Sequence, residues 1–146
     1  MSENTGNTET IVYPVLPDFE TDVFDTVVTY PPLVEIVPAG NFRSEYVAEI
    51  DSLPLCTLIR MDSFPEWRRE STSDSEDLTV ETYEAHVYAK TMDECKQIAG
   101  YLCERMRQMN FRRLSMRPLL NGNDIQIQQI VMRFEHRIDS HGRMYR

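Results

Sequence analysis

One helix with a polar start and a polar stop constrains the fold of this chain more than any other feature. Thr91 and Glu94 have the spacing of a capping box, which marks a helix N-terminus. An apolar stripe at helical spacing follows, made of Cys95, Ile98, Ala99, Leu102, Met106 and Met109. Asn110 then offers a left-handed stop. Because strand-like segments flank this helix on both sides, the sequence predicts that its apolar stripe lies across a sheet.

The segment before this helix has the clearest strand pattern. Val80 to Ala89 alternates, with Tyr83, Ala85 and Val87 on its apolar face and His86 on the more polar one. We interpret His86 as an exposed or cross-strand polar residue, with a ligand role as the alternative. Other predicted strands are Arg43–Ile50, Leu55–Met61, Phe111–Leu119 and Ile125–Ile138, with turns at Asn121–Asp124 and Asp139–Gly142.

A second helix is expected near the N-terminus, at about residues 18–29, with Asp18 as its cap. One face of it is apolar, formed by Phe19, Val23, Phe24, Val27 and Val28. Pro31 and Pro32 are expected to end it. These elements together predict an α+β fold, with two main helices packed on one face of a largely antiparallel sheet and one long β-hairpin loop.

Length and apolar content favour a single folded unit. The chain has 146 residues, of which 41% are hydrophobic, enough for one packed core. Residues 1–10 are predicted to form a polar N-terminal arm, residues 11–139 a single domain, and residues 140–146 a short tail. The start of the sequence has no basic stretch followed by an apolar one, so neither a signal peptide nor a membrane partner is expected.

Residues 62–79 form the most unusual segment. Ser and acidic residues dominate after Arg69, which is typical of a long hairpin loop with a binding role. The segment contains the only Trp, at position 67, next to Arg68 and Arg69, and ends near Glu76 and Asp77. Trp and Arg are favoured anchors at protein interfaces, so this loop is a candidate for partner contact. The alternative is that Trp67 packs back on its own sheet.

The net charge of −9 argues against a general binder of nucleic-acid phosphates. The charge is divided unevenly, since residues 100–146 carry nine Arg and four acidic residues, a net of +5, and residues 1–99 carry −14. Such a chain can self-associate through unlike patches or present opposite charges to two partners. The alternative is that the two halves interleave in the fold and the patches disappear.

The sequence predicts no enzyme. Cys56, Cys95 and Cys103 have no metal-binding spacing and are interpreted as small apolar residues in a reducing compartment. No glycine-rich phosphate loop or hydrolase motif is present. We therefore expect no catalytic residues, no cofactor and no metal.

Residues 50–146 resemble the tail terminator proteins of long-tailed bacteriophages, also called tail completion or tail-to-head joining proteins. The order and spacing of several segments carry this resemblance: Leu53–Asp62, Trp67–Ser71, Glu81–Ala89, Thr91–Ile98, Asn110–Leu119, Asn121–Asp124, Ile130–Phe134 and Asp139–Arg146. The N-terminal helix resembles that of the family in position only.

The resemblance implies a hexameric ring that caps the completed tail tube, stops its polymerisation and offers a joining surface to the head connector, without catalysis. Its partners would be copies of itself, the tail tube protein and the neck proteins, while genomic DNA passes through the lumen without specific binding. Its location would be the tail–neck junction of the virion, after assembly in the host cytoplasm. Candidate partner-contact residues are Trp67, Arg68, Arg69, Glu76, Asp77, Arg112, Arg113, Arg143 and Tyr145. Two alternatives are another neck component, such as a head-closure or connector protein, and a free cytoplasmic binding module or small enzyme.

Overall fold

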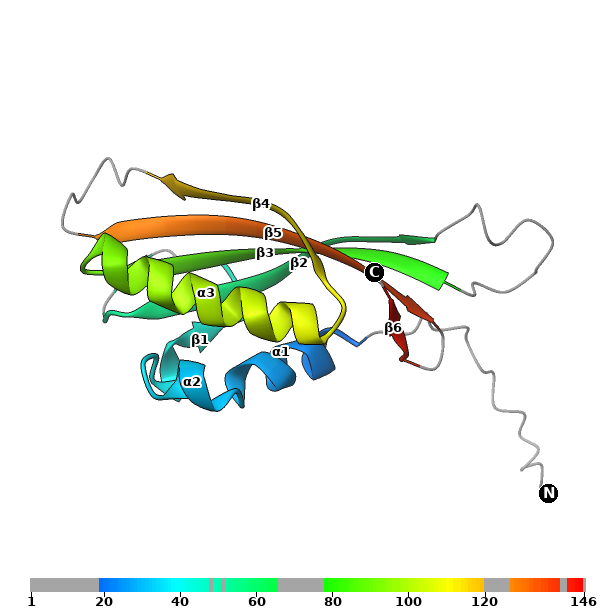
Figure 1. Cartoon of the computed structure of the whole chain (residues 1–146), viewed down its shortest axis with the longest axis horizontal. Helices are drawn as coiled ribbons and strands as arrows, with labels where there is room; N and C mark the ends of the chain where they lie inside the picture. Colours follow the sequence, from blue (N-terminus) through cyan, green and yellow to red (C-terminus); the bar gives the residue numbers. More distant parts are fainter. Residues whose placement is uncertain are drawn as a thin grey trace, which may run out of the picture.

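The computed structural model describes residues 19–47, 49–50, 52–65, 78–119, 127–139 and 142–145. Three helices lie on one side of a curled sheet (Figure 1). The helices are α1 (Glu20–Val28), α2 (Pro31–Val34) and α3 (Met92–Gln108), and a 3₁₀ turn, η2, covers Ala39–Asn41. The strands are β1 (Phe42–Arg43), β2 (Leu55–Pro65), β3 (Leu78–Ala89), β4 (Arg112–Leu119), β5 (Gln128–Asp139) and β6 (Met144–Tyr145). The predicted α+β class is confirmed.

The sheet has the order β1-β2-β3-β5-β4, and β6 pairs with the end of β5. β1 runs parallel to β2, and all the other pairs are antiparallel. The two long central strands, β3 and β5, pair along twelve residues each, from Leu78 opposite Asp139 to Ala89 opposite Gln128. Bulges interrupt β2 between Arg60 and Asp62 and β4 between Arg113 and Ser115. The bulges add local twist to a sheet that already curls.

Helix α3 begins and ends where the sequence predicts. The Thr91 hydroxyl accepts a hydrogen bond from the backbone N–H of Glu94, over 3.1 Å. Asn110 adopts φ +64° and ends the helix. The whole predicted stripe from Cys95 to Met109 is buried against the sheet. The core therefore forms between α3 and the inner faces of β2, β3 and β5.

The N-terminal helices α1 and α2 pack against α3 and contribute buried side chains to the same core (Figure 1). Val23 and Val27 of α1 are buried, as the predicted apolar face requires. The N-cap is Phe19 and makes no side-chain capping bond, so the prediction of Asp18 as the cap is wrong, and Asp18 lies outside the described residues. Pro31 and Pro32 do follow α1, but they also start α2, because proline fits the first turn of a helix.

Three predicted boundaries change. The prediction of a strand at Arg43–Ile50 is wrong, because in the described part of this segment only Arg43 belongs to a strand, together with the preceding Phe42. The hairpin loop predicted at 62–79 is shorter, since β2 continues to Pro65 and β3 starts at Leu78. The predicted C-terminal tail contains β6, whose Met144 pairs with Ile138 of β5. These short or extended pairings depend on neighbouring strands, which local sequence does not reveal.

The turn before β6 requires a glycine. Gly142 has φ +86°, and its N–H donates to the carbonyl of Asp139 over 3.1 Å. A Cβ at this position would meet the Phe19 ring at 3.1 Å. Gly142 therefore allows both the left-handed turn and the close approach of the start of α1.

Candidate functional site

Of the residues predicted to contact partners, Arg112, Arg113, Arg143 and Tyr145 fall within the described part of the chain. The others, Trp67, Arg68, Arg69, Glu76 and Asp77, lie outside the described residues, as does the predicted turn Asn121–Asp124. The described candidates lie on β4 and around β6. These two elements pair with successive stretches of β5, β4 up to Glu135 and β6 at Arg137 and Ile138. The side-chain amide of Asn110, which precedes β4, donates to the Met144 carbonyl over 2.8 Å.

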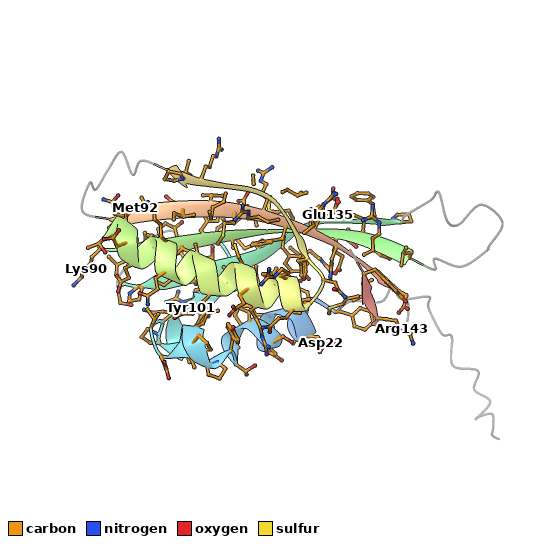
Figure 2. All side chains as sticks on the ribbon, in the orientation of Figure 1. Asp22, Lys90, Met92, Tyr101, Glu135 and Arg143 are labelled. Carbon is orange, nitrogen blue, oxygen red and sulfur yellow. The ribbon has the colours of Figure 1, made fainter. Side chains whose placement is uncertain are left out.

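Strand β4 is the most exposed element of the sheet. Seven of its eight side chains are exposed, and only Leu119 is partly buried. It carries Arg112, Arg113 and Arg117 and no acidic residue. Arg112 lies on the sheet face away from α3 and binds Glu135, with 3.1 Å between Nη2 and Oε2. Figure 2 shows Glu135 on that face. Among the described residues, Arg113 and Arg117 have no carboxylate within 4 Å, so β4 is a cationic edge.

Arg113 lies on the other face of β4, where it lines a groove between β4 and α3. The groove has a volume of about 470 Å³, and its remaining lining comes from Gly100, Cys103, Glu104, Arg107, Phe111, Arg112 and Phe134. Glu104 is engaged elsewhere, because it accepts a hydrogen bond from the Tyr30 hydroxyl. The groove therefore presents arginine side chains from both walls.

The cysteine in this groove is not activated. Burial raises the pKa of Cys103, although a hydrogen bond and the charge of Arg113 act in the opposite direction. Burial also raises the pKa of Cys56 to about 12 and that of Cys95 to about 11. All three thiols therefore stay protonated near neutral pH, whereas a nucleophilic cysteine needs a lowered pKa.

A polar network lies on the sheet face away from the helices. Glu84, on β3, is almost fully buried and accepts hydrogen bonds from His86 Nε2 at 2.8 Å and Arg133 Nε at 2.9 Å. Gln129 Nε2 donates to His86 Nδ1 at 2.8 Å. Since Nδ1 accepts, the proton of the neutral ring sits on Nε2. His86 is thus a cross-strand polar residue, as predicted, and both of its ring nitrogens are engaged.

The pKa of Glu84 shows how strongly its partners hold the carboxylate. Burial alone would raise this pKa, but the hydrogen bonds and charges of His86 and Arg133 outweigh burial and lower it. Arg133 comes from the basic half of the chain and Glu84 from the acidic half, so the two halves interleave at the centre of the sheet. They do not interleave at β4, where the arginines gather.

A second polar pair lies inside the core, and sequence reasoning missed it. His136 Nε2 and Glu81 Oε1 are 2.9 Å apart, and the side chains are 0% and 1% exposed. The Phe111 ring stacks on His136 at 3.7 Å between centroids, and Arg60 reaches Glu81 at 3.4 Å. The available signal was the alternation of side chains along the two strands. It puts Glu81 on the same face as Tyr83, and His136 on the same face as Phe134.

The C-terminal candidates form a local turn structure. The Tyr145 hydroxyl donates to Asp139 Oδ2 over 3.2 Å, and the Arg143 N–H donates to Asp139 Oδ1 over 2.9 Å. Figure 2 places Arg143 beside β6, at the end of the molecule away from Met92. The guanidinium of Arg143 is exposed and remains available for contact.

The described residues contain no cluster of three or more His, Cys, Asp or Glu side chains that could hold a metal ion. In the same residues, no helix has the length and apolar character needed to cross a membrane. Neither a scan of family models nor a search of curated proteins finds a match to this chain.

Proposed function

We propose that this chain is a structural virion protein that forms a ring at the end of a completed phage tail tube. The ring stops tube polymerisation and provides the surface that joins the head connector, while DNA passes through its lumen. Its place is the tail–neck junction, and it assembles in the host cytoplasm. The resemblance of residues 50–146 to tail terminators supports this proposal.

One structural observation carries the proposal furthest. The sheet ends on one side in the cationic β4 and on the other in the two-residue β1, beyond which β2 continues without a paired strand among the described residues. A ring needs a heterologous contact, in which two different surfaces of the same chain meet and the rotation closes. A subunit with two unlike open edges on one sheet has such surfaces.

Deletion of the gene in a phage that encodes this chain tests the proposed function. We expect overlong or ragged tails that fail to join heads, observed by negative-stain electron microscopy of lysates. Expression of the intact chain from a plasmid is the control and should restore both tail length and head attachment. Tails of normal length would reject the terminator role, and normal tails without heads would indicate a different neck component.

A further inference from the structure

Both ends of the sheet leave strand backbone unpaired within the described residues. β4 has β5 on one side and no strand on the other. At the opposite end, within the described residues, β1 pairs only with Cys56 and Thr57 of β2. Of the remaining stretch of β2, Leu58 is buried, Ile59 and Arg60 are partly buried, and Met61–Pro65 are exposed. An open edge offers a row of backbone N–H and C=O groups to another chain.

We propose that, in solution, the β4 edge of one copy of this chain pairs with the Leu58–Pro65 edge of a second copy. The sheet then continues from subunit to subunit, and repetition of this one contact closes the ring. The inference rests on the proposed function and adds to it the contact that holds neighbouring subunits together.

Strand direction allows this contact without any reversal of the neighbour. The pairs β2–β3, β3–β5 and β5–β4 are all antiparallel, so β2 and β4 of one copy run in opposite directions. Rotation about an axis along the strands preserves strand direction. A neighbour generated in this way presents its β2 antiparallel to β4, with its helices on the same side of the sheet. Such a contact is head-to-tail, as a cyclic ring requires.

The open stretches also lie at the same height in the sheet. Following the register from strand to strand, Arg112 is level with Asp62, and Met116 is level with Leu58. Pro118 is level with Cys56, which β1 already covers. Proline in an edge strand has no N–H to offer a neighbour. The part of β4 that can pair, from Arg112 to Met116, is therefore level with Leu58–Asp62, of which Met61 and Asp62 are exposed.

Charge favours this contact over a symmetric one. Two β4 edges placed together would gather three arginines from each copy. The β2 edge carries Asp62 and Arg60. Equal heights would place Asp62 opposite Arg112 and Arg60 opposite Arg113, but Arg60 is already paired with Glu20 and Glu81 of its own chain. Opposite charges directly across a strand pair are stabilising, and like charges are destabilising.

Two exposed apolar side chains lie in the stretches that would meet. Met61 and Leu114, the extra residues at the β2 and β4 bulges, are 45% and 47% exposed. Exposed apolar groups of this size are typical of a surface that a partner covers. Within one chain, the same two side chains also line a small pocket together with Thr82, Tyr83 and Arg133.

The first test adds a positive charge at the proposed contact. Met61→Lys places a cation against the β4 arginines, and Val34→Lys is the matched control, because Val34 is also an exposed apolar residue but lies on α2. Native mass spectrometry over a concentration series should show oligomers for the wild type and Val34→Lys. For Met61→Lys, like-charge repulsion should raise the dissociation constant about tenfold or more.

An unchanged oligomer in Met61→Lys, or a wild type that stays monomeric at every concentration, would overturn the edge contact. Circular dichroism of Met61→Lys should match that of the control, which shows that the variant is folded.

The second test maps the contact directly. Met61→Cys and Leu114→Cys are made separately in a Cys103→Ser background, since Cys56 and Cys95 are buried. A short bismaleimide should cross-link a mixture of the two proteins into dimers, but neither protein alone. Cross-linking of either variant with itself, or none in the mixture, contradicts head-to-tail pairing.

The two proposals fail separately. Overlong tails in the deletion phage, combined with no cross-link in the mixture, would leave the tail function standing and reject the edge contact. Cross-linked oligomers together with normal tails in the deletion phage would reject the tail function and leave the edge contact standing.

Discussion

Glu81 and His136 form a polar contact inside the core, with both side chains almost completely buried. A buried carboxylate without a partner is costly, so each residue requires the other. The backbone register supplies the partner by placing Glu81 opposite His136 across β3 and β5. The Phe111 ring stacks on the His136 ring, and the Tyr83 ring lies nearly perpendicular to it. At the scale of single residues, strand register decides whether these two polar side chains can be buried.

Replacing His136 by Phe should destabilise the fold by about 3 kcal/mol, because an aromatic ring is kept while the buried Glu81 loses its closest partner and retains the longer, 3.4 Å contact with Arg60. The double variant Glu81→Leu/His136→Phe should lose clearly less than the sum of the two single changes. Urea denaturation of the wild type, both single variants and the double variant completes the cycle. Additive losses would show that the two side chains do not depend on each other.

The lowered pKa of Glu84 predicts a pH dependence with a definite sign. A carboxyl group whose folded pKa lies below its unfolded value stabilises the fold above the unfolded pKa, here near 4.5. That stabilisation is lost as the pH falls through the folded pKa. Glu84→Gln should therefore be less stable than the wild type at pH 7, by roughly 1–2 kcal/mol, and the difference should shrink below pH 4.5.

Thermal unfolding of Glu84→Gln and the wild type between pH 3 and 7 measures this difference. Glu135→Gln is a useful control, because the ion pair of Glu135 is with the exposed Arg112 and should contribute little. A difference between Glu84→Gln and the wild type that stays constant across the pH range would contradict the predicted role of Glu84.

At the scale of elements, the end of α3 connects the helix to the C-terminal strand. Asn110 reverses the chain with φ +64° and its side chain bonds the Met144 carbonyl of β6. The Phe111 N–H also returns to the Met106 carbonyl over 3.0 Å. Asn110 thus ends α3, precedes β4 and holds β6 through a side-chain hydrogen bond.

Two substitutions at Asn110 separate these roles. Asn110→Gly keeps the left-handed conformation and loses the bond to Met144, so it should cost about 1 kcal/mol or less. Asn110→Ala loses both and should cost roughly 1–2 kcal/mol more than the glycine variant. Chemical denaturation of the two variants checks this order, and equal losses would mean that backbone conformation at this position is unimportant.

At the scale of the whole molecule, one face of the sheet is covered by helices and both edges are open within the described residues (Figure 1). The two edges lie at opposite ends of the strand order and do not pair with each other in the described part of the chain. If copies close them, folding and assembly are linked by mass action. Stability then depends on protein concentration.

We expect the melting temperature of the wild type to rise with protein concentration, since assembly stabilises the folded state. Met61→Lys should need about tenfold more protein than the wild type to reach the same melting temperature, whereas Val34→Lys should behave like the wild type. Differential scanning calorimetry over a hundredfold range of concentration measures this. The same concentration dependence in Met61→Lys and Val34→Lys would argue against assembly through the β2 edge.

The sequence by itself determined the elements whose stability is local. The cap at Thr91, the stripe of α3, the stop at Asn110 and the alternation of β3 all follow from side-chain spacing, and each is found where the pattern predicts it. Local hydrogen bonds and a single apolar face suffice to define such elements.

Only the tertiary structure decided which residues meet across the sheet. The register of β3 and β5 pairs Glu81 with His136 and Glu84 with Arg133. The strand order places the β4 arginines at an edge, and β1 ends after two residues. These contacts join residues far apart in the chain, and the free energy of such pairing depends on neighbouring strands and burial. No spacing within one segment contains that information.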